Sequence, residues 1–447
     1  MERPTRRTFI AGGATAGFIG LAGCLGDDTD DDDDNDTAPP DDGDDGDDTA
    51  PPDDGDDTEP FEAQYEVWAL DQGTEWIHIY EPTETGIFQS TEQIDTFGDE
   101  AQMPHMIHYS SDYEYAVIAC TGGGEEGYAK TLVYRTEDRE LVANLETGPG
   151  THFAGFSPDD DAIIVDVIGE SKIVKIDADL DAEEFTIADE IEISEAIDGL
   201  TEQEGAPICH SYDHSGRSIH TLGPAYGNAG VVIVDHDDFS VDVAFSGEEL
   251  PANCGTMPHP TEDKFYLTAG APTPTDDEGE PIEGEEGVGA YYVLDTETDE
   301  LLVDGASTEG VDAHGFWFTP DGEELWVLNR ETNDGVIVDP DTDDVIDEID
   351  AFGPADDPDD HTARDAPDIM WADPTGEHMF VSLRGTQPRS GDPHAATGVT
   401  SGFSVIDIES RAIEDVVQVD PDAFASDVHG IGVRPFDPDA SLSPPFN

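Results

Sequence analysis

The chain has 447 residues and a formal net charge of −92, with 108 acidic residues against 16 basic ones. No basic surface is available to neutralise phosphates, so this composition excludes a nucleic-acid-binding protein. Self-repulsion of this size destabilises a compact domain in dilute buffer but is screened within about 3 Å in molar salt. We therefore expect a protein of an extreme halophile.

Residues 1–24 are typical of an export signal. Arg6 and Arg7, followed by the sequence TFI, resemble the twin-arginine motif, and the apolar stretch after them is too short and glycine-rich to span a bilayer stably. The segment ends in LAGC, which resembles a lipobox. This implies a lipid anchor at Cys24 and a protein held at the extracellular face of the cell membrane. The alternative is an uncleaved anchor helix.

Residues 25–60 form the next segment, which is dominated by Asp, Thr, Pro and Gly. Residues 27–60 have no large apolar side chains whose burial could offset the entropy lost on ordering. Like charges also extend such a chain. We predict an acidic, disordered stalk.

From residue 61 onward, short β-branched and aromatic runs alternate with turn residues, without helical periodicity. One unit recurs as a strand, a turn rich in Ser, Pro, Asp and Gly, and a second strand, as in HFAGFSPDDDAIIV. A further hairpin follows each copy except the last, so each complete repeat supplies a four-stranded antiparallel blade. The copies start at residues 105, 152, 208, 254, 314, 368 and 429.

Repeats of this length with four strands each indicate a β-propeller. The last copy has room for one strand only, while three strands precede the first copy, near residues 65–96. The C-terminal strand is therefore expected to join the N-terminal blade, which leaves no open sheet edge. We predict an all-β domain over residues 61–447, a seven-bladed β-propeller closed in this way.

The FSPDG-like turns and the hairpins that follow them resemble the YVTN-type family of seven-bladed propellers over residues 61–447. This resemblance implies the fold and leaves the chemistry open. The superfamily includes metal-site enzymes, lactonases, metallochaperones and binding proteins, so function must be argued from the site.

Candidate functional residues occupy one equivalent position in the repeats, six residues before the turn proline or its counterpart. The first strand of each propeller blade is innermost, so these positions should meet at one mouth of the axial channel. Imidazole and thiolate groups suit zinc or copper. We predict a transition-metal site with the ligands His105, His152, His314, His429, Asp368 and Cys254.

A ring of histidines in a seven-bladed channel resembles the copper-cluster domain of nitrous-oxide reductases and the copper-binding selenium-binding-protein family. The chain has fewer histidines than those reductases use, which favours a mononuclear site. A polar channel without metal and a pocket for a small organic ligand remain as alternatives. Cys209 and Cys254 begin adjacent blades, and a disulfide between them would remove Cys254 as a ligand.

Two function classes follow from this pattern. The first is a binding protein that stores, delivers or senses a metal ion, or presents a surface to a protein partner. The second is an enzyme, either a copper oxidoreductase or a metal-assisted hydrolase such as a lactonase, with His361 or Asp365 as its candidate base. We favour a monomeric binding protein that contacts the membrane only through its lipid anchor. The sequence also suggests that His220, His236 and His378 are ordinary strand or turn residues.

Overall fold

The computed structural model describes residues 61–123, 126–197, 205–223, 230–276, 279–356, 363–420 and 423–438. The predicted export signal with Arg6, Arg7 and Cys24 lies outside these residues, as does the predicted stalk. Within the described ranges, no helix has both the length and the apolar character needed to cross a membrane.

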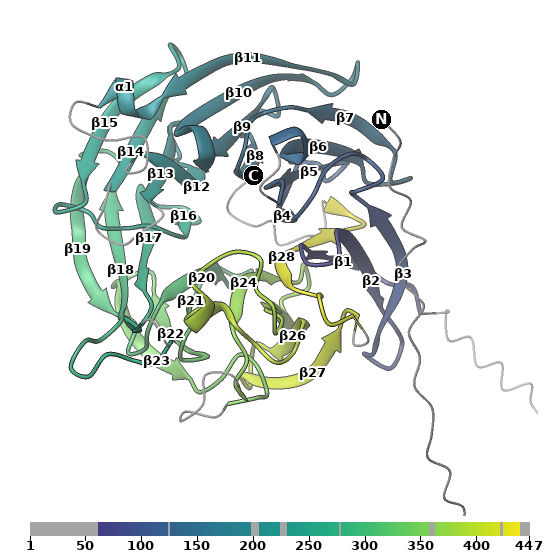
Figure 1. Cartoon of the computed structure of the whole chain (residues 1–447), viewed down its shortest axis with the longest axis vertical. Helices are drawn as coiled ribbons and strands as arrows, with labels where there is room; N and C mark the ends of the chain where they lie inside the picture. Colours follow the sequence, from purple (N-terminus) through teal and green to yellow (C-terminus); the bar gives the residue numbers. More distant parts are fainter. Residues whose placement is uncertain are drawn as a thin grey trace, which may run out of the picture. The chain divides into compact units, whose positions relative to one another are not determined.

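Seven four-stranded antiparallel sheets are arranged around a central axis (Figure 1). We number these blades in chain order. The first contains β28 (Val428–Pro435), β1 (Tyr65–Asp71), β2 (Trp76–Pro82) and β3 (Phe88–Asp95). The second contains β4 (Pro104–Tyr109), β5 (Tyr115–Cys120), β6 (Lys130–Arg135) and β7 (Leu141–Leu145). The third contains β8 (Thr151–Phe156), β9 (Ala162–Val167), β10 (Lys172–Asp179) and β11 (Glu184–Glu192).

The remaining four blades repeat this arrangement. The fourth contains β12 (Ala206–Tyr212), β13 (Ser218–Gly223), β14 (Gly230–Asp235) and β15 (Ser240–Ser246). The fifth contains β16 (Thr256–Pro258), β17 (Lys264–Ala271), β18 (Val288–Asp295) and β19 (Glu300–Ser307). The sixth contains β20 (Ala313–Phe318), β21 (Leu325–Asn329), β22 (Asp334–Asp339) and β23 (Asp344–Ile349). The seventh contains β24 (Pro367–Ala372), β25 (His378–Leu383), β26 (Gly402–Asp407) and β27 (Ala412–Gln418). The short helices α1 (Ile193–Ala196) and α2 (Pro393–Ala396) lie in connections.

The ring closes between the two ends of the domain, which confirms the predicted seven-bladed propeller. Strand β28 pairs antiparallel with β1, with Val67 opposite Val433 and Trp68 opposite Gly432. The same β1 pairs on its other side with β2. One blade therefore combines the C-terminal strand with three N-terminal strands, so neither end of the domain leaves its strand without a partner.

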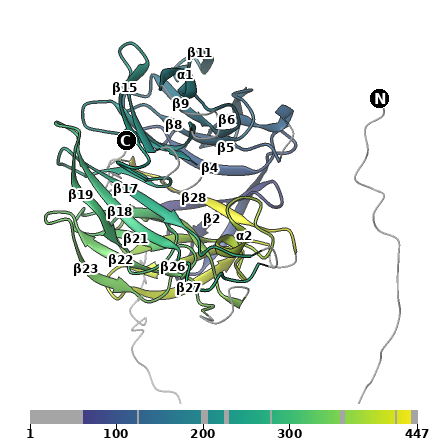
Figure 2. The same cartoon turned by 60° about the vertical axis from the view of Figure 1, so that its left-hand side comes forward.

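The pattern of burial follows from the position of each strand in its blade. Second strands such as β9 are buried along their whole length, because neighbouring blades cover both faces. Outermost strands such as β19 alternate between exposed and half-buried residues. Figure 2 shows β17, β18 and β19 of one blade side by side. The core therefore lies between blades.

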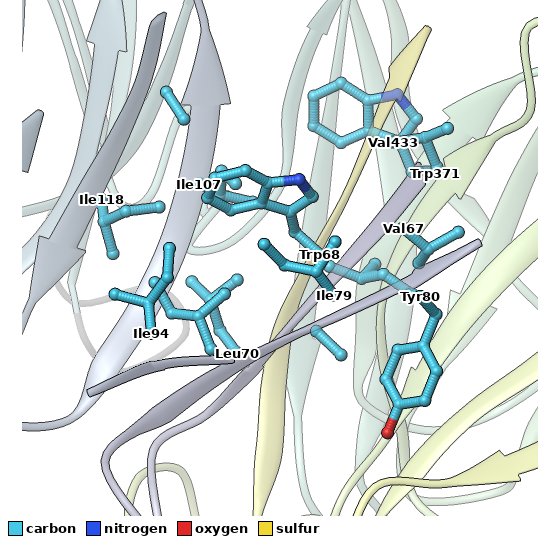
Figure 3. Packing of buried hydrophobic residues seen from close by; sticks show 14 of the residues in the cluster. Val67, Trp68, Leu70, Ile79, Tyr80, Ile94, Ile107, Ile118, Trp371 and Val433 are labelled. Atoms are coloured by element: carbon cyan, nitrogen blue, oxygen red, sulfur yellow. The ribbon is translucent and has the colours of Figure 1, made fainter. Parts of the chain in front are cut away.

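The largest apolar cluster joins the first, second and seventh blades. Trp68 of β1 is fully buried there, among Ile107 and Ile118 of the second blade and Trp371 of the seventh (Figure 3). Since Trp371 is distant in sequence from Trp68, this packing stabilises the closure of the ring.

Candidate metal centre in the axial channel

Five of the six predicted ligands share one structural position. Each is the second residue of an innermost strand, and Cys254 lies two residues before β16. Around the ring, β28 contacts β4 and β24, β4 contacts β8, and β24 contacts β20. The five residues that occupy the shared position are His105, His152, His314, Asp368 and His429.

At each of these five positions the pairing of the innermost strand with its neighbour is irregular. For example, Pro104 and Met106 have partners in β5 whereas His105 between them has none, and Thr151 and Phe153 flank His152 in the same way. Similar register shifts surround the other three residues. A β-bulge re-aims a side chain away from the regular alternation of a strand. The bulges therefore present these side chains near the axis.

Two imidazoles of the group contact each other directly. The Nε2 atom of His105 lies 3.0 Å from the Nε2 atom of His152. The Nδ1 atom of His105 is 3.1 Å from Oε1 of Gln72, whose amide nitrogen donates to Asp427, so Nδ1 must be the donor. The Nδ1 atom of His152 lies 2.9 Å from the carbonyl oxygen of Ile208, which can only accept. Both neutral rings therefore direct an Nε2 lone pair at the other.

His429 and His314 are held by the same kind of contact. Nδ1 of His429 lies 3.1 Å from the carbonyl oxygen of His105, and its ring stacks on that of His105 with centroids 3.6 Å apart. A Cβ at Gly430 would lie 2.3 Å from that carbonyl oxygen, so the approach requires glycine. Nδ1 of His314 lies 3.0 Å from Oδ1 of Asp368. Metal-binding histidines usually have one ring nitrogen anchored and the other free. The Nε2 atom of His429, however, lies 3.5 Å from Oδ2 of Asp368.

Burial sets the protonation of most of these rings. It lowers the pKa of His105 and of His429 well below the ordinary value, and it lowers the pKa of His152 to about 4. These three rings are neutral at neutral pH, which is the form that binds metals. His314 differs, because Cys254 and Asp368 outweigh the effect of burial and raise its pKa to about 10. Its imidazole is therefore an imidazolium.

Asp368 is surrounded by cations. Its Oδ2 lies 2.7 Å from Nη1 of Arg384, and its Oδ1 lies 3.3 Å from Nη1 of Arg330 and 3.0 Å from Nδ1 of His314. Burial alone would raise the pKa of this carboxyl, but His429, His314 and the two guanidinium groups hold it well below its usual range. Asp368 thus balances buried positive charge and anchors His314, while ligation of a metal by Asp368 stays a prediction.

The two cysteines near the axis are free thiols, so the disulfide considered from the sequence is not formed in the structure. The Sγ atom of Cys209 lies 3.8 Å from Nδ1 of His152. Burial and the neighbouring Cys254 raise the pKa of Cys209 well above its ordinary value. Cys254 therefore remains available as a soft ligand.

A cavity of about 100 Å³ lies on the axis beside these groups. His152, His314, His429, Cys209 and Cys254 contribute to its wall. Trp317 and Trp371, whose rings stack with centroids 4.3 Å apart, line it as well. The cavity thus combines nitrogen and sulfur donors with an otherwise apolar surface.

A second group of donors lies beside the channel, and sequence reasoning missed it. Among the described residues, Asp166, His210 and His220 form a group of three whose ligand atoms lie within 4.8 Å of one another, so this group could hold a metal ion. None of the six predicted ligands belongs to it. His220, which we expected to be an ordinary strand residue, lies in this group. A lone aspartate inside the apolar strand AIIVDV was the signal that could have pointed to Asp166.

Asp365, one of the two candidate bases for an enzyme, has a structural role in the fold. The carboxylate of Asp365 accepts hydrogen bonds from the backbone nitrogens of Ala355 and Thr400, at 2.9 and 3.0 Å, and so holds two loops together. His361 lies outside the described residues. His378 contacts Asp373 of its own turn at 3.1 Å, as expected for a turn residue.

No protein-family model matches the chain, and no curated protein matches it. Solved structures do. A protein from Lactobacillus plantarum is 13% identical with a TM-score of 0.57, over 83% of this chain and 99% of that one. A functionally unknown protein from Desulfotomaculum acetoxidans is 13% identical with a TM-score of 0.56, over 84% and 100%. The periplasmic gluconolactonase PpgL of Pseudomonas aeruginosa is 13% identical with a TM-score of 0.55, over 83% and 99%.

Similarity at this level of identity shows the β-propeller fold alone. Membership of the YVTN-type family and an origin in a halophile therefore stay predictions. The chemistry of this chain has to be inferred from its own side chains.

Proposed function

We propose that this chain is a cell-surface, lipid-anchored propeller that binds one transition-metal ion, zinc or copper, in its axial channel. His105 and His152 are the primary ligands. The observation that supports this proposal is the pair of Nε2 atoms, which face each other at 3.0 Å with both Nδ1 atoms engaged as donors.

The spacing of the two nitrogens suits a shared ion. Two imidazole nitrogens bonded to one zinc ion at about 2.0–2.1 Å lie about 2.9–3.4 Å apart when the bond angle is near 90–110°. The observed separation falls in this range. Without a cation between them, two lone pairs at this distance repel each other. Binding an ion converts this repulsion into two bonds.

The surroundings favour reversible binding over a closed structural site. The His105–His152 pair already has its nitrogens at the separation that one ion requires, whereas Cys254 and His429 border the cavity and could complete the coordination. His314 borders it too but would first have to lose its proton. Closed structural zinc sites normally have four protein ligands. A site with two fixed ligands, His105 and His152, and further donors in the cavity wall suits storage, delivery or sensing of the ion. The thiol donors among them favour copper or zinc.

The deciding experiment is metal binding by a double variant. His105→Gln with His152→Gln should lose the channel metal, measured as metal equivalents per chain by elemental analysis after loading with Zn²⁺ or Cu⁺ in high salt. The control is His78→Gln, since His78 is a similarly buried histidine in β2, held by Gln93. Unchanged metal content in the double variant would refute the proposal.

Export and anchoring belong to the same proposal and are tested separately. Cys24→Ser should release the protein into the medium or leave the precursor unprocessed, because the lipid is attached there. Arg6→Lys combined with Arg7→Lys should block export. Membrane association that survives Cys24→Ser would mean that the apolar segment itself is the anchor.

A further inference from the structure

The geometry points to a second metal site, separate from the channel. We propose that Asp166, His210 and His220 bind one divalent cation of the zinc type between the third and fourth blades, where it joins the two blades. None of the three is a ligand in the proposed channel site, so the two sites can be tested independently.

Three strands from two blades supply these ligands. Asp166 lies on β9 of the third blade, and His210 and His220 lie on β12 and β13 of the fourth. Nδ1 of His210 is 2.7 Å from Oδ2 of Asp166, and Nδ1 of His220 is 2.7 Å from Oδ1. The two rings are 4.6 Å apart between centroids. One carboxylate and two imidazoles form a donor set that divalent zinc-like ions accept.

The charge of the group favours a bound cation. Asp166 is fully buried, and His210 and His220 are at most 2% exposed. In the described part of the chain, the ion-pair partners of Asp166 are these two histidines, and no lysine or arginine contacts it. The buried Asp368, in contrast, is paired with two guanidinium groups. A buried carboxylate without a positive partner is strongly unfavourable, and a divalent ion supplies that partner.

The outer contacts of His220 match those of a metal-bound histidine. Its Nε2 lies 2.7 Å from Oγ of Ser218, which in turn lies 2.8 Å from Nε2 of His236. A ligating histidine usually donates its second N–H to such an acceptor, which fixes the orientation of the ring. Ser218 and His236 therefore hold His220 in position for ligation through Nδ1.

His210 connects the group to the channel. Its ring lines the axial cavity, whereas Asp166 and His220 do not, so an ion can reach the group from that side. Its Nε2 is buried and has no hydrogen-bond partner among the described residues. Phe153 packs against the ring, with centroids 4.9 Å apart at 82°, and limits its rotation. His210 is thus fixed with Nδ1 toward Asp166.

The same distances are compatible with a proton shared within the group, and the experiment separates the two cases. The full chain is stripped with a chelator in high salt and reloaded with Co²⁺ or Zn²⁺. Bound equivalents are measured by elemental analysis, and ligand-field absorption is measured for cobalt. We expect two equivalents for the wild type and one for Asp166→Asn and for His220→Gln. Zinc should raise the unfolding temperature of these variants less than that of the wild type.

Further variants make the outcome decisive. Ser218→Ala keeps all three ligands and should weaken this site about 10- to 100-fold. It provides a test even if the ligand variants fail to fold. His78→Gln, a buried histidine in another blade, should keep two equivalents. Equal metal content in wild type, Asp166→Asn and His220→Gln would overturn the inference and leave a shared proton. If the channel proposal alone fails, the wild type binds one equivalent and Asp166→Asn binds none.

Discussion

The Nε2 atoms of His105 and His152 face each other at 3.0 Å across the start of two neighbouring blades. Each ring is held in this position by an acceptor for its Nδ1 hydrogen, a side-chain amide oxygen for His105 and a backbone carbonyl for His152. Burial keeps the pKa of both rings low, so protonation does not relieve the contact at neutral pH. The two Nε2 lone pairs are therefore available to bind a metal cation.

The amide of Gln72 should tune metal affinity through His105. Gln72→Leu removes the acceptor of the Nδ1 hydrogen, so the ring is no longer held in the tautomer that presents the Nε2 lone pair. We expect the affinity of the channel for zinc to fall about 10- to 100-fold, measured by competition with a chromophoric chelator. Gln93→Leu is the matched control, because Gln93 contacts His78 in the same blade, and it should leave the affinity unchanged. Equal effects of both variants would contradict this role.

Closure of the ring should be essential for folding. Removing residues 427–447 deletes β28, which exposes the edge of β1 and opens the cluster around Trp68. We expect this truncation to abolish cooperative unfolding measured by circular dichroism. Truncation after Pro438 spares every described strand and should leave the transition unchanged. A folded monomer lacking β28 would show that the closure is dispensable.

His108 should make the fold sensitive to acid. Its Nδ1 accepts a hydrogen bond from the backbone nitrogen of Phe156 at 3.2 Å, and burial lowers its pKa to about 3. Between pH 6.5 and 3 the unfolded chain binds a proton at this residue that the folded chain does not bind. The free energy of unfolding should therefore fall as the pH falls, by about 1 kcal/mol per pH unit from this residue. His108→Gln should show a smaller loss in urea titrations from pH 7 to pH 4.5, and equal losses would refute the assignment.

Stability should also depend steeply on salt. With a net charge of −92, the folded chain is destabilised by repulsion that is long-ranged in dilute buffer and screened within about 3 Å at 1 M salt. We expect the unfolding temperature to rise continuously as the salt concentration is raised about tenfold, from 0.1 M to about 1 M. Sucrose of equal osmolality is the control, since it does not screen charge. A midpoint independent of salt would remove the argument for a halophile.

Much of the architecture could be predicted because it depends on local patterns of apolar and turn residues. Apolar runs alternating with turns of Ser, Pro, Asp and Gly indicated the strands. The last repeat has only its first strand, and the three strands that it lacks match the three strands near Trp68 that precede the first repeat. The shared position of His105, His152, His314, Asp368 and His429 also followed from the repeats, since equivalent residues of equivalent strands lie around one axis.

The contacts that decide the chemistry come from other blades. Gln72 lies 33 residues from His105, and Asp166 lies 54 residues from His220, so spacing in the sequence carries no sign of either pair. The bulge that re-aims each innermost residue leaves no pattern that sequence alone could reveal. Strand and blade formation depends on local polarity, which the sequence by itself determined. Which ring nitrogen is free, and which carboxylate lacks a cation, depends on neighbours that only the folded ring brings within a few ångströms.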